Sequence, residues 1–219
     1  MPAITVLVPV LNAEKYISRC LRSLLDQTLP RSEYQILVVD DGSTDKTNEV
    51  LQTFLGDIDL IVLDNNRGLP TALNLGIKKS RSKYLVRVDA DDYVNREFLA
   101  TLKSYFIYSP PCDAVSCDYL LVNDSEEIIR RASAVTEPIA CGIMFQRDHL
   151  LSLGLYNEEF RYLEDEEMRL RFLQIYTIGC IPIPLYRYRR HEKNMTNNLA
   201  KLNEYEAKLN LTRMKSEEV

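Results

Sequence analysis

The chain of 219 residues lacks features that mark several large classes of protein. It has no uninterrupted apolar run near the roughly 20 residues that span a bilayer. Its first residues, MPAITVLVPVLNAEKY, carry neither a basic segment nor the cleavage site of a signal peptide. No G-x-G-x-x-G occurs, which argues against a dinucleotide-dependent dehydrogenase. Net positive charge is absent too, because the formal charge is −5, so we expect no nonspecific binding to nucleic acid.

Cysteine is scarce and odd in number, with five residues that are mostly scattered. Only Cys112 and Cys117 lie close together, and no histidine stands near them at a zinc-finger spacing. This usage is typical of reduced, mostly buried thiols. We therefore expect a protein of the cytoplasm, with peripheral contact at the inner face of the membrane left open.

What is present is the composition of a globular protein: 46% hydrophobic and 27% charged residues. A chain of this length can bury a substantial core. No low-complexity linker and no internal repeat divides it, so we predict one domain.

Apolar β-rich runs alternate with segments of helical spacing over the first 90 residues. The predicted strands cover residues 3–10, 35–39, 60–64 and 84–88, and the predicted helices cover residues 16–25, 45–55 and 70–80. This alternation predicts an α/β fold with a mostly parallel sheet and helices on both faces.

The second half is less regular. Two runs flank the turn residues NDS and predict an antiparallel hairpin. Residues 95–108 and 164–174 have helical periodicity, and residues 199–219 predict an amphipathic helix with Leu199, Leu202, Tyr205, Leu209 and Met214 near one face. The segment GCIPIPLYRYRRH predicts an edge strand or a loop, because its prolines cannot donate to a sheet.

Polar residues follow each of the four predicted parallel strands. They are Asn12 and Glu14 after the first strand, DDGSTD after the second, DNNRG after the third and DADD after the fourth. In open parallel sheets, ligands bind beyond the carboxyl ends of the strands. Four such segments in phase predict a binding site at this edge.

The acidic cluster DADD, with Asp89, Asp91 and Asp92, would repel itself unless something compensates its charge. Alternate carboxylates at a strand end can converge on Mg²⁺ or Mn²⁺. The plainer explanation is that Asp91 or Asp92 caps a helix that starts near Asn95.

Each of the other polar segments alone is weak evidence for a binding site. Ser43 or Asp45 can simply cap a helix, while Asp40 or Asp41 could accept hydrogen bonds from a base or ribose. Gly68 could let the backbone approach a ligand, and Arg67 could lie near phosphate.

Two later segments carry charge. The consecutive acids of YLEDEEMRLRF have two interpretations. They are typical of the N-terminus of a helix, or one of them is a general base. In YRYRRHEKNMTNN, His191 could be a metal ligand or a phosphate contact, with the arginines compensating phosphate charge.

Together these segments resemble the consecutive motifs of family 2 glycosyltransferases, the inverting nucleotide-sugar enzymes of GT-A fold. The resemblance rests on VLVPVLNAEKYISRCLRSLLDQT, ILVVDDGSTDKT, NRGLPTALNLGI and YLVRVDADDYV, followed by LEDEEMRLR and YRRHEKNMT. It covers about residues 4–198 in the right order. It implies one GT-A domain over residues 1–198, with a nucleotide-binding half to about residue 95 and an acceptor-binding half after it, and a helical tail over residues 199–219.

The resemblance also implies residue roles. Pro9, Asn12 and Glu14 would lie near the nucleoside, and Asp40 or Asp41 would contact the base or ribose. Asp89 would contact the ribose or the donor sugar. Asp91, with Asp92, would hold Mn²⁺ or Mg²⁺ as part of the Asp-x-Asp motif, and His191 would complete metal or diphosphate binding. Asp165 would be the base, with Glu164 beside it. Arg67, Gly68, Asn74 and Ala90 complete the predicted nucleotide-sugar site. Leu73 departs from the arginine that many members carry there, which leaves the diphosphate contacts near that helix open.

The predicted reaction moves a sugar from a nucleotide-diphosphate sugar, with UDP favoured, to an acceptor hydroxyl with inversion. The predicted acceptor is a cell-surface polysaccharide or a lipid-linked glycan, and a homodimer is left open. A sugar-1-phosphate nucleotidyltransferase is the first alternative, although the segment PVLNAEKY lacks the expected glycine-rich loop. A noncatalytic nucleotide-sugar-binding module is the second alternative.

Overall fold

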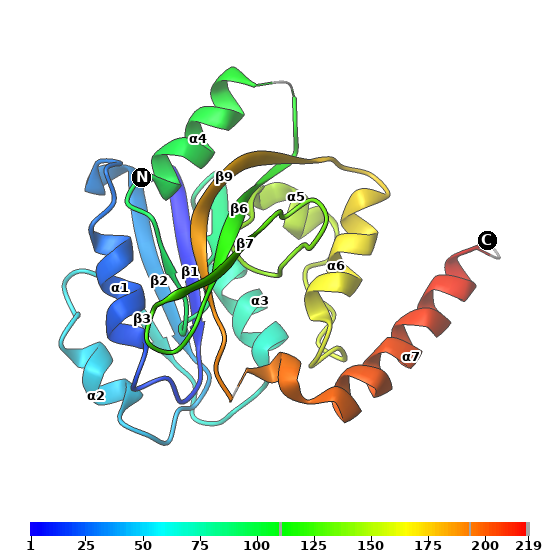
Figure 1. Ribbon diagram of the computed structural model, residues 1–219, viewed down its shortest axis with the longest axis horizontal. Coiled ribbons are helices and arrows are strands. Elements are labelled where there is room, and N and C mark those ends of the chain that lie inside the picture. The colour runs from blue at the N-terminus through cyan, green and yellow to red at the C-terminus, as the bar shows by residue number, and fades with distance from the viewer. Residues whose placement is uncertain (110, 193, 218–219) are drawn as a thin grey trace.

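The computed structural model describes residues 1–109, 111–192 and 194–217, and side chains of the last helix as far as residue 211. Within these ranges, nine strands form one sheet in the order β3-β2-β1-β4-β8-β6-β9-β5, with β7 paired to β6 (Figure 1). The strands are β1 (Ile4–Val10), β2 (Tyr34–Asp40), β3 (Asp59–Val62), β4 (Tyr84–Arg87), β5 (Tyr93–Val94), β6 (Ala114–Val122), β7 (Ile128–Ala132), β8 (Met144–Gln146) and β9 (Ile178–Arg189). The predicted α/β fold is confirmed.

Helices cover both faces of the sheet. They are α1 (Ile17–Leu25), α2 (Thr47–Gln52), α3 (Leu69–Lys79), α4 (Phe98–Tyr108), α5 (Arg147–Ser152), α6 (Glu164–Leu173) and α7 (Leu199–Glu217), with short 3-10 turns at Arg31–Glu33 and Met195–Asn197. Alternate residues of β1 decide the layers: Val6 and Val8 pack with α1, α2 and α4, whereas Leu7 packs with α3, α5 and α6. Every residue of β1 is buried, as expected for a central parallel strand.

The strands β1, β2, β3 and β4 run parallel, so their carboxyl ends meet at one edge, the lower edge of the sheet in Figure 1. The polar segments identified in the sequence follow these ends. The strand β9 also ends near this edge and brings the segment containing His191 to it. The fold therefore gathers polar loops from both halves of the chain.

The strand β9 shows how the structure accommodates two prolines. It pairs in parallel with β6, and its other side meets only the two residues of β5, so most of that side is an edge. The register between β6 and β9 is irregular around Asp118, where Pro184 lies opposite Asp118 and Pro182 falls within the register shift. Proline is tolerated at such irregularities because no ladder hydrogen bond is lost there.

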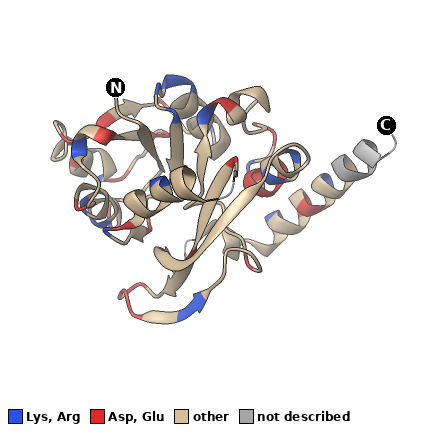
Figure 2. Cartoon of the chain, turned by 90° about the horizontal axis from the view of Figure 1, so that it is seen from above, with Lys and Arg blue, Asp and Glu red and all other residues tan. Residues whose placement is uncertain are grey.

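The helix α7 extends away from the body of the molecule (Figures 1 and 2). Leu209 is buried and Leu202 and Tyr205 are partly buried, whereas Leu199 is exposed. The predicted apolar face is thus only partly covered, and the side chain of Met214 lies outside the described residues. Figure 2 shows charged residues of both signs spread over helices and loops. No helix within the described residues has the length and apolar character needed to cross a bilayer.

Candidate active site

The acidic loop after β4 is held by a buried arginine. Arg87 Nε and Nη2 donate to both oxygens of Asp89 at 2.6 and 3.0 Å, and Arg87 Nη1 donates to Glu164 Oε1 at 2.9 Å. The Arg87 side chain is only 6% exposed. One guanidinium therefore joins the end of β4 to the start of α6. It also links Asp89 to the helical turn that carries Asp165.

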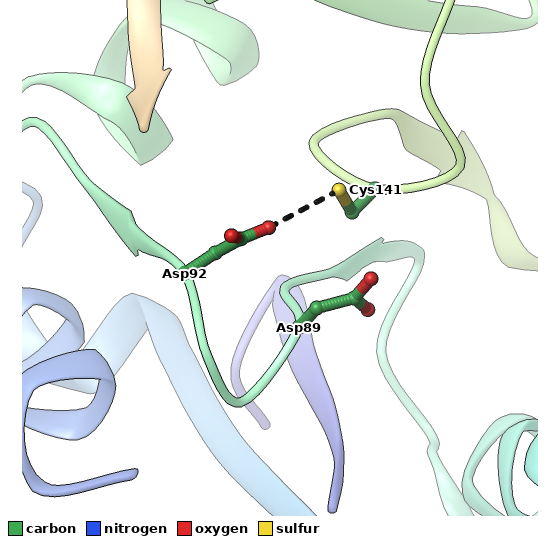
Figure 3. Close-up of side chains that lie close together, drawn as sticks. All are labelled: Asp89, Asp92 and Cys141. Atoms are coloured by element: carbon green, nitrogen blue, oxygen red, sulfur yellow. Dashed lines mark hydrogen bonds between the residues drawn. The ribbon is translucent and has the colours of Figure 1, made fainter. Parts of the chain in front are cut away.

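Asp92 ties the same loop to β9. Its Oδ1 accepts the backbone N–H of Arg189 at 2.8 Å, and its Oδ2 accepts the hydroxyl of Tyr186 at 2.8 Å. The thiol of Cys141 lies 3.5 Å from the same Oδ2 (Figure 3). Burial, followed by the charges of Asp91 and Asp89, raises the pKa of Asp92 well above its usual range. Asp92 is thus an anchor inside the protein.

Asp89, Asp92 and Cys141 offer ligand atoms within 4.8 Å of one another (Figure 3). This group does not fit a hard divalent cation. Both Asp89 oxygens accept from Arg87, and both Asp92 oxygens are engaged. Burial raises the pKa of the Cys141 thiol well above its usual value, so the thiol stays protonated, and Mg²⁺ and Mn²⁺ prefer oxygen ligands to sulfur.

Asp91 and His191 do fit such a cation. The Oδ2 of Asp91 lies 2.9 Å from Nε2 of His191, although the two residues are 100 positions apart. The Asp91 side chain is 29% exposed, so a ligand can approach it. The ring of Tyr16 stacks on the His191 ring with centroids 4.8 Å apart, and Asn194 Oδ1 accepts the backbone N–H of His191 at 2.6 Å. A carboxylate and an imidazole held this way can share one metal ion.

Asp165 lies in the first turn of α6, which begins after Leu163 in a left-handed conformation with φ 57°. Burial raises the pKa of Asp89, opposed by Arg87, and the charges of Asp91 and Asp165 add to the rise. Asp91 and Asp165 therefore lie close enough to Asp89 for their negative charges to raise its pKa. Beside Asp165, burial raises the pKa of Glu164 to about 7 despite the charge of Arg87.

The loops after β1 and β2 hold each other. Asn12, with φ 51°, accepts the N–H of Thr44 on its side chain at 2.8 Å and donates its own N–H to Ser43 Oγ at 2.9 Å. Glu14 Oε2 accepts the N–H of Lys46 at 2.8 Å. Asn12 and Glu14, predicted near the nucleoside, thus shape the loop that follows Asp40.

Asp40 and Asp41 differ sharply in their partners. Asp41 accepts the backbone N–H groups of Arg67 and Gly68, both at 2.8 Å, and so fixes the loop after β3. Asp40 Oδ1 accepts the N–H of Ser43 at 2.9 Å, whereas its buried Oδ2 has no partner within the described residues. A buried, unpaired carboxylate oxygen is costly, which marks it as an acceptor that awaits a donor.

The remaining predicted residues surround this edge. Pro9 is buried in β1, Ala90 is buried in the acidic loop, and Arg67 is exposed. Asn74 exchanges hydrogen bonds with the backbone of Tyr156 at 2.9 and 3.0 Å, so it ties α3 to the segment before α6.

Sequence reasoning missed several contributors: Arg87, Tyr16, Tyr186 and Asn194. Only Arg87 left a usable signal. A charged residue inside the apolar run YLVRV must be paired when buried, and the nearest acids in sequence follow it directly.

The sequence profile of glycosyl transferase family 2 matches residues 5–182, which is most of the chain. The poly(ribitol-phosphate) beta-N-acetylglucosaminyltransferase TarS of Staphylococcus aureus is 38% identical over 102 residues, covering 45% of this chain and 18% of TarS. This chain thus matches less than a fifth of that relative's length.

Solved structures resemble the fold. The crystal structure of residues 1–349 of TarS in complex with UDP-GlcNAc superposes with a TM-score of 0.78 at 22% identity, over 90% of this chain and 61% of that one. The mannosyltransferase PcManGT from Pyrobaculum calidifontis, in complex with GDP-Man and Mn²⁺, gives a TM-score of 0.76 at 20% identity, over 98% of this chain and 64% of that one. The chain belongs to glycosyl transferase family 2. The predicted family and the GT-A fold are confirmed.

Proposed function

We propose that this chain transfers a sugar from a nucleotide-diphosphate sugar to an acceptor hydroxyl, with inversion at the anomeric carbon. The observation that carries this proposal is the pairing of Asp91 with His191 at the carboxyl end of β4, 2.9 Å apart, with Asp165 on the adjoining turn. Family membership supports a glycosyltransferase over a sugar-1-phosphate nucleotidyltransferase.

The nucleoside would bind against the loops after β1 and β2. The unpaired Oδ2 of Asp40 suits an N–H donor such as the imide of uracil, whereas Asp41 acts indirectly by fixing the backbone of Arg67 and Gly68. TarS was solved in complex with UDP-GlcNAc, which supports UDP as the nucleotide. A UDP-sugar is therefore the favoured donor.

Asp91 and His191 would hold Mn²⁺ or Mg²⁺, and Asp92 would keep the loop in place through β9. A divalent cation bound there supplies positive charge that stabilises the departing nucleoside diphosphate. The presence of Mn²⁺ in the related PcManGT structure supports this choice of metals.

Asp165 would act as the base that takes the proton from the acceptor hydroxyl. That hydroxyl then attacks the anomeric carbon on the face opposite the diphosphate, so one carboxylate base suffices. Asp89, oriented by Arg87, would contact the donor's ribose or sugar. The acceptor we propose is a cell-surface polysaccharide or a lipid-linked glycan, in line with the name of TarS. A cytoplasmic location and a homodimer stay predictions.

The test is a panel of nucleotide-sugars with Mn²⁺, read as thermal stabilisation and as slow hydrolysis of the donor. We expect a UDP-sugar to raise Tm and to be hydrolysed in a metal-dependent way. Asp91→Asn should lose both effects, while the control Asp57→Asn, an exposed acid between α2 and β3, keeps them. Metal-dependent binding without hydrolysis of any donor would instead indicate a noncatalytic binding module.

A further inference from the structure

A pocket of about 560 Å³ lies between α1 and the strands β5 and β9. Four of the nine residues that line it are arginines, from segments far apart in the sequence. The charged and aromatic residues among them are Arg19, Arg22, Asp26, Tyr93, Arg96 and Arg187, and we call it the arginine pocket.

The arginine pocket is positive in a protein of net charge −5, because four arginines and one aspartate line it. Arg19 is ion-paired with Glu126 at 3.1 Å. Within the described parts of the chain, Arg22, Arg96 and Arg187 form no ion pair; Arg187 donates to the carbonyls of Pro184 and Tyr186 at 2.7 and 3.3 Å. Burial lowers the pKa of Arg187, which means that burying its positive charge costs free energy. A bound anion would offset that cost.

The pocket adjoins the acidic loop. Tyr93 follows Asp92 directly and pairs with Arg187 across β5 and β9. The ring of Tyr93 has the Arg19 guanidinium at 4.1 Å and the Arg189 guanidinium at 5.4 Å. Arg189 in turn donates from Nε to the carbonyl of Asp91 at 2.8 Å. Arg189 therefore lies between Tyr93, in the lining of the pocket, and Asp91, one of the residues proposed to hold the metal.

We propose that the arginine pocket binds a phosphate group carried by the acceptor. This rests on the proposed transferase function and specifies its acceptor as a phosphate-bearing molecule. Planar guanidinium groups match phosphate oxygens in pairs and keep their charge at every physiological pH. The concave shape suits a phosphate group of an extended molecule whose hydroxyl reaches the site next door.

The experiment measures binding of sn-glycerol 3-phosphate by titration calorimetry, with saturating UDP and Mg²⁺ filling the donor site. We expect binding by the wild type and about tenfold or more weaker binding by Arg22→Gln/Arg96→Gln, because charge-assisted hydrogen bonds are lost. The matched control, Lys78→Gln/Arg81→Gln, removes the same charge from exposed positions elsewhere and should bind as the wild type does. Equal binding by all three proteins, or no binding by the wild type, overturns the proposal.

Two further arms separate the remaining outcomes. Sedimentation with phosphatidylglycerol vesicles tests whether the phosphate belongs to a lipid surface. If the protein binds these vesicles through Arg22 and Arg96 but does not bind glycerol 3-phosphate, the pocket is a membrane-binding site and not an acceptor site. Donor hydrolysis by water is measured on the same variants and should be unchanged. If the wild type shows no hydrolysis, the transferase function fails, whereas normal hydrolysis with unaltered phosphate binding in the double variant refutes only the arginine pocket.

Discussion

Arg87 is the residue on which the geometry of the site most depends. Its buried guanidinium serves Asp89 and Glu164 together, and both partners are carboxylates that burial alone would neutralise. Removing one member of a buried ion pair leaves an uncompensated charge, at a cost of about 3–5 kcal/mol. Arg87 thus holds β4 and α6 in a fixed relation, with the acids of the site between them.

Glu164 should make stability depend on pH. Its pKa is about 7 in the folded protein against 4.5 for the free side chain, so the folded state retains a proton that the unfolded chain loses. Its stabilising contribution is complete below pH 4.5 and is lost as pH rises through 7. We expect the Tm of the wild type, relative to Glu164→Gln, to fall between pH 4.5 and 7 and then level off. Parallel Tm profiles for the two proteins would contradict this.

Asp165 should matter for turnover and not for donor binding. Loss of a general base slows reactions by about 10²–10⁴-fold. Asp165→Asn should therefore reduce donor hydrolysis by that factor while the Kd for UDP stays the same. The control is Glu166→Gln in the same helical turn, which should retain hydrolysis. Undiminished hydrolysis in Asp165→Asn would remove the base from the mechanism.

The candidate site was predictable only in part, and the reason is physical. Motifs at strand ends point to Asp40 or Asp41, to Asp91 and to His191, because the sheet brings these ends together, whereas Asp165 is indicated by the acidic motif at the start of a helix. The division of labour between Asp40 and Asp41, or between Asp91 and Asp92, depends on which oxygens the backbone of distant segments occupies. Such partners, for example the N–H of Arg189 on Asp92, leave no local pattern in the sequence.

The helix α3 packs unusually close to β1. A Cβ added at Gly76 would lie 2.2 Å from Cδ1 and 2.9 Å from Cδ2 of Leu7, which is fully buried. A glycine in a helix normally costs about 1 kcal/mol relative to alanine. At this position the close approach of the helix requires it.

Gly76→Ala should consequently destabilise the protein, by about 1–3 kcal/mol, the usual cost of overpacking a core. The measurement is the free energy of unfolding in urea. The control is Lys78→Ala on the exposed side of the same helix, whose free energy of unfolding should stay within about 0.5 kcal/mol of the wild type. Leu7→Val should recover part of the loss in the double variant. A stabilised Gly76→Ala would show that α3 does not pack this closely.

Most elements follow from the sequence, whereas the short ones do not. The predicted strands and helices of the first half match the observed elements within a few residues, and the predicted hairpin is β6 and β7. The strand β8 has three residues and β5 has two, too few to show a periodicity. Their position is decided by pairing with β4 and β9.

The helix α7 extends away from the rest of the molecule (Figure 1). It rests on the segment before α6: the Tyr205 ring lies 6.1 Å from that of Phe160 and 5.6 Å from that of Tyr162, and Lys208 Nζ is 3.1 Å from Glu159 Oε2. The remaining layers meet in two continuous cores on either side of the sheet. A domain over residues 1–198 with a separable tail therefore stays our prediction.

Truncation after residue 198 tests that division. We expect residues 1–198 to unfold cooperatively, with Tm lower by about 5–10 °C because the contacts of Tyr205 and Leu209 are lost. UDP should still raise its Tm. Tyr205→Ala in the full chain should reproduce part of the loss. A truncated chain without a cooperative transition would make α7 an integral part of the domain.

We propose that Asp91 and His191 hold a divalent cation beside the donor diphosphate, and anomalous diffraction from crystals soaked with Mn²⁺ and UDP would locate that cation. We expect one manganese peak at about 2.0–2.3 Å from Oδ2 of Asp91 and Nε2 of His191, with UDP phosphate oxygens on its other side. Bound UDP with a peak among Asp89, Asp92 and Cys141, or with no peak at Asp91, would contradict it.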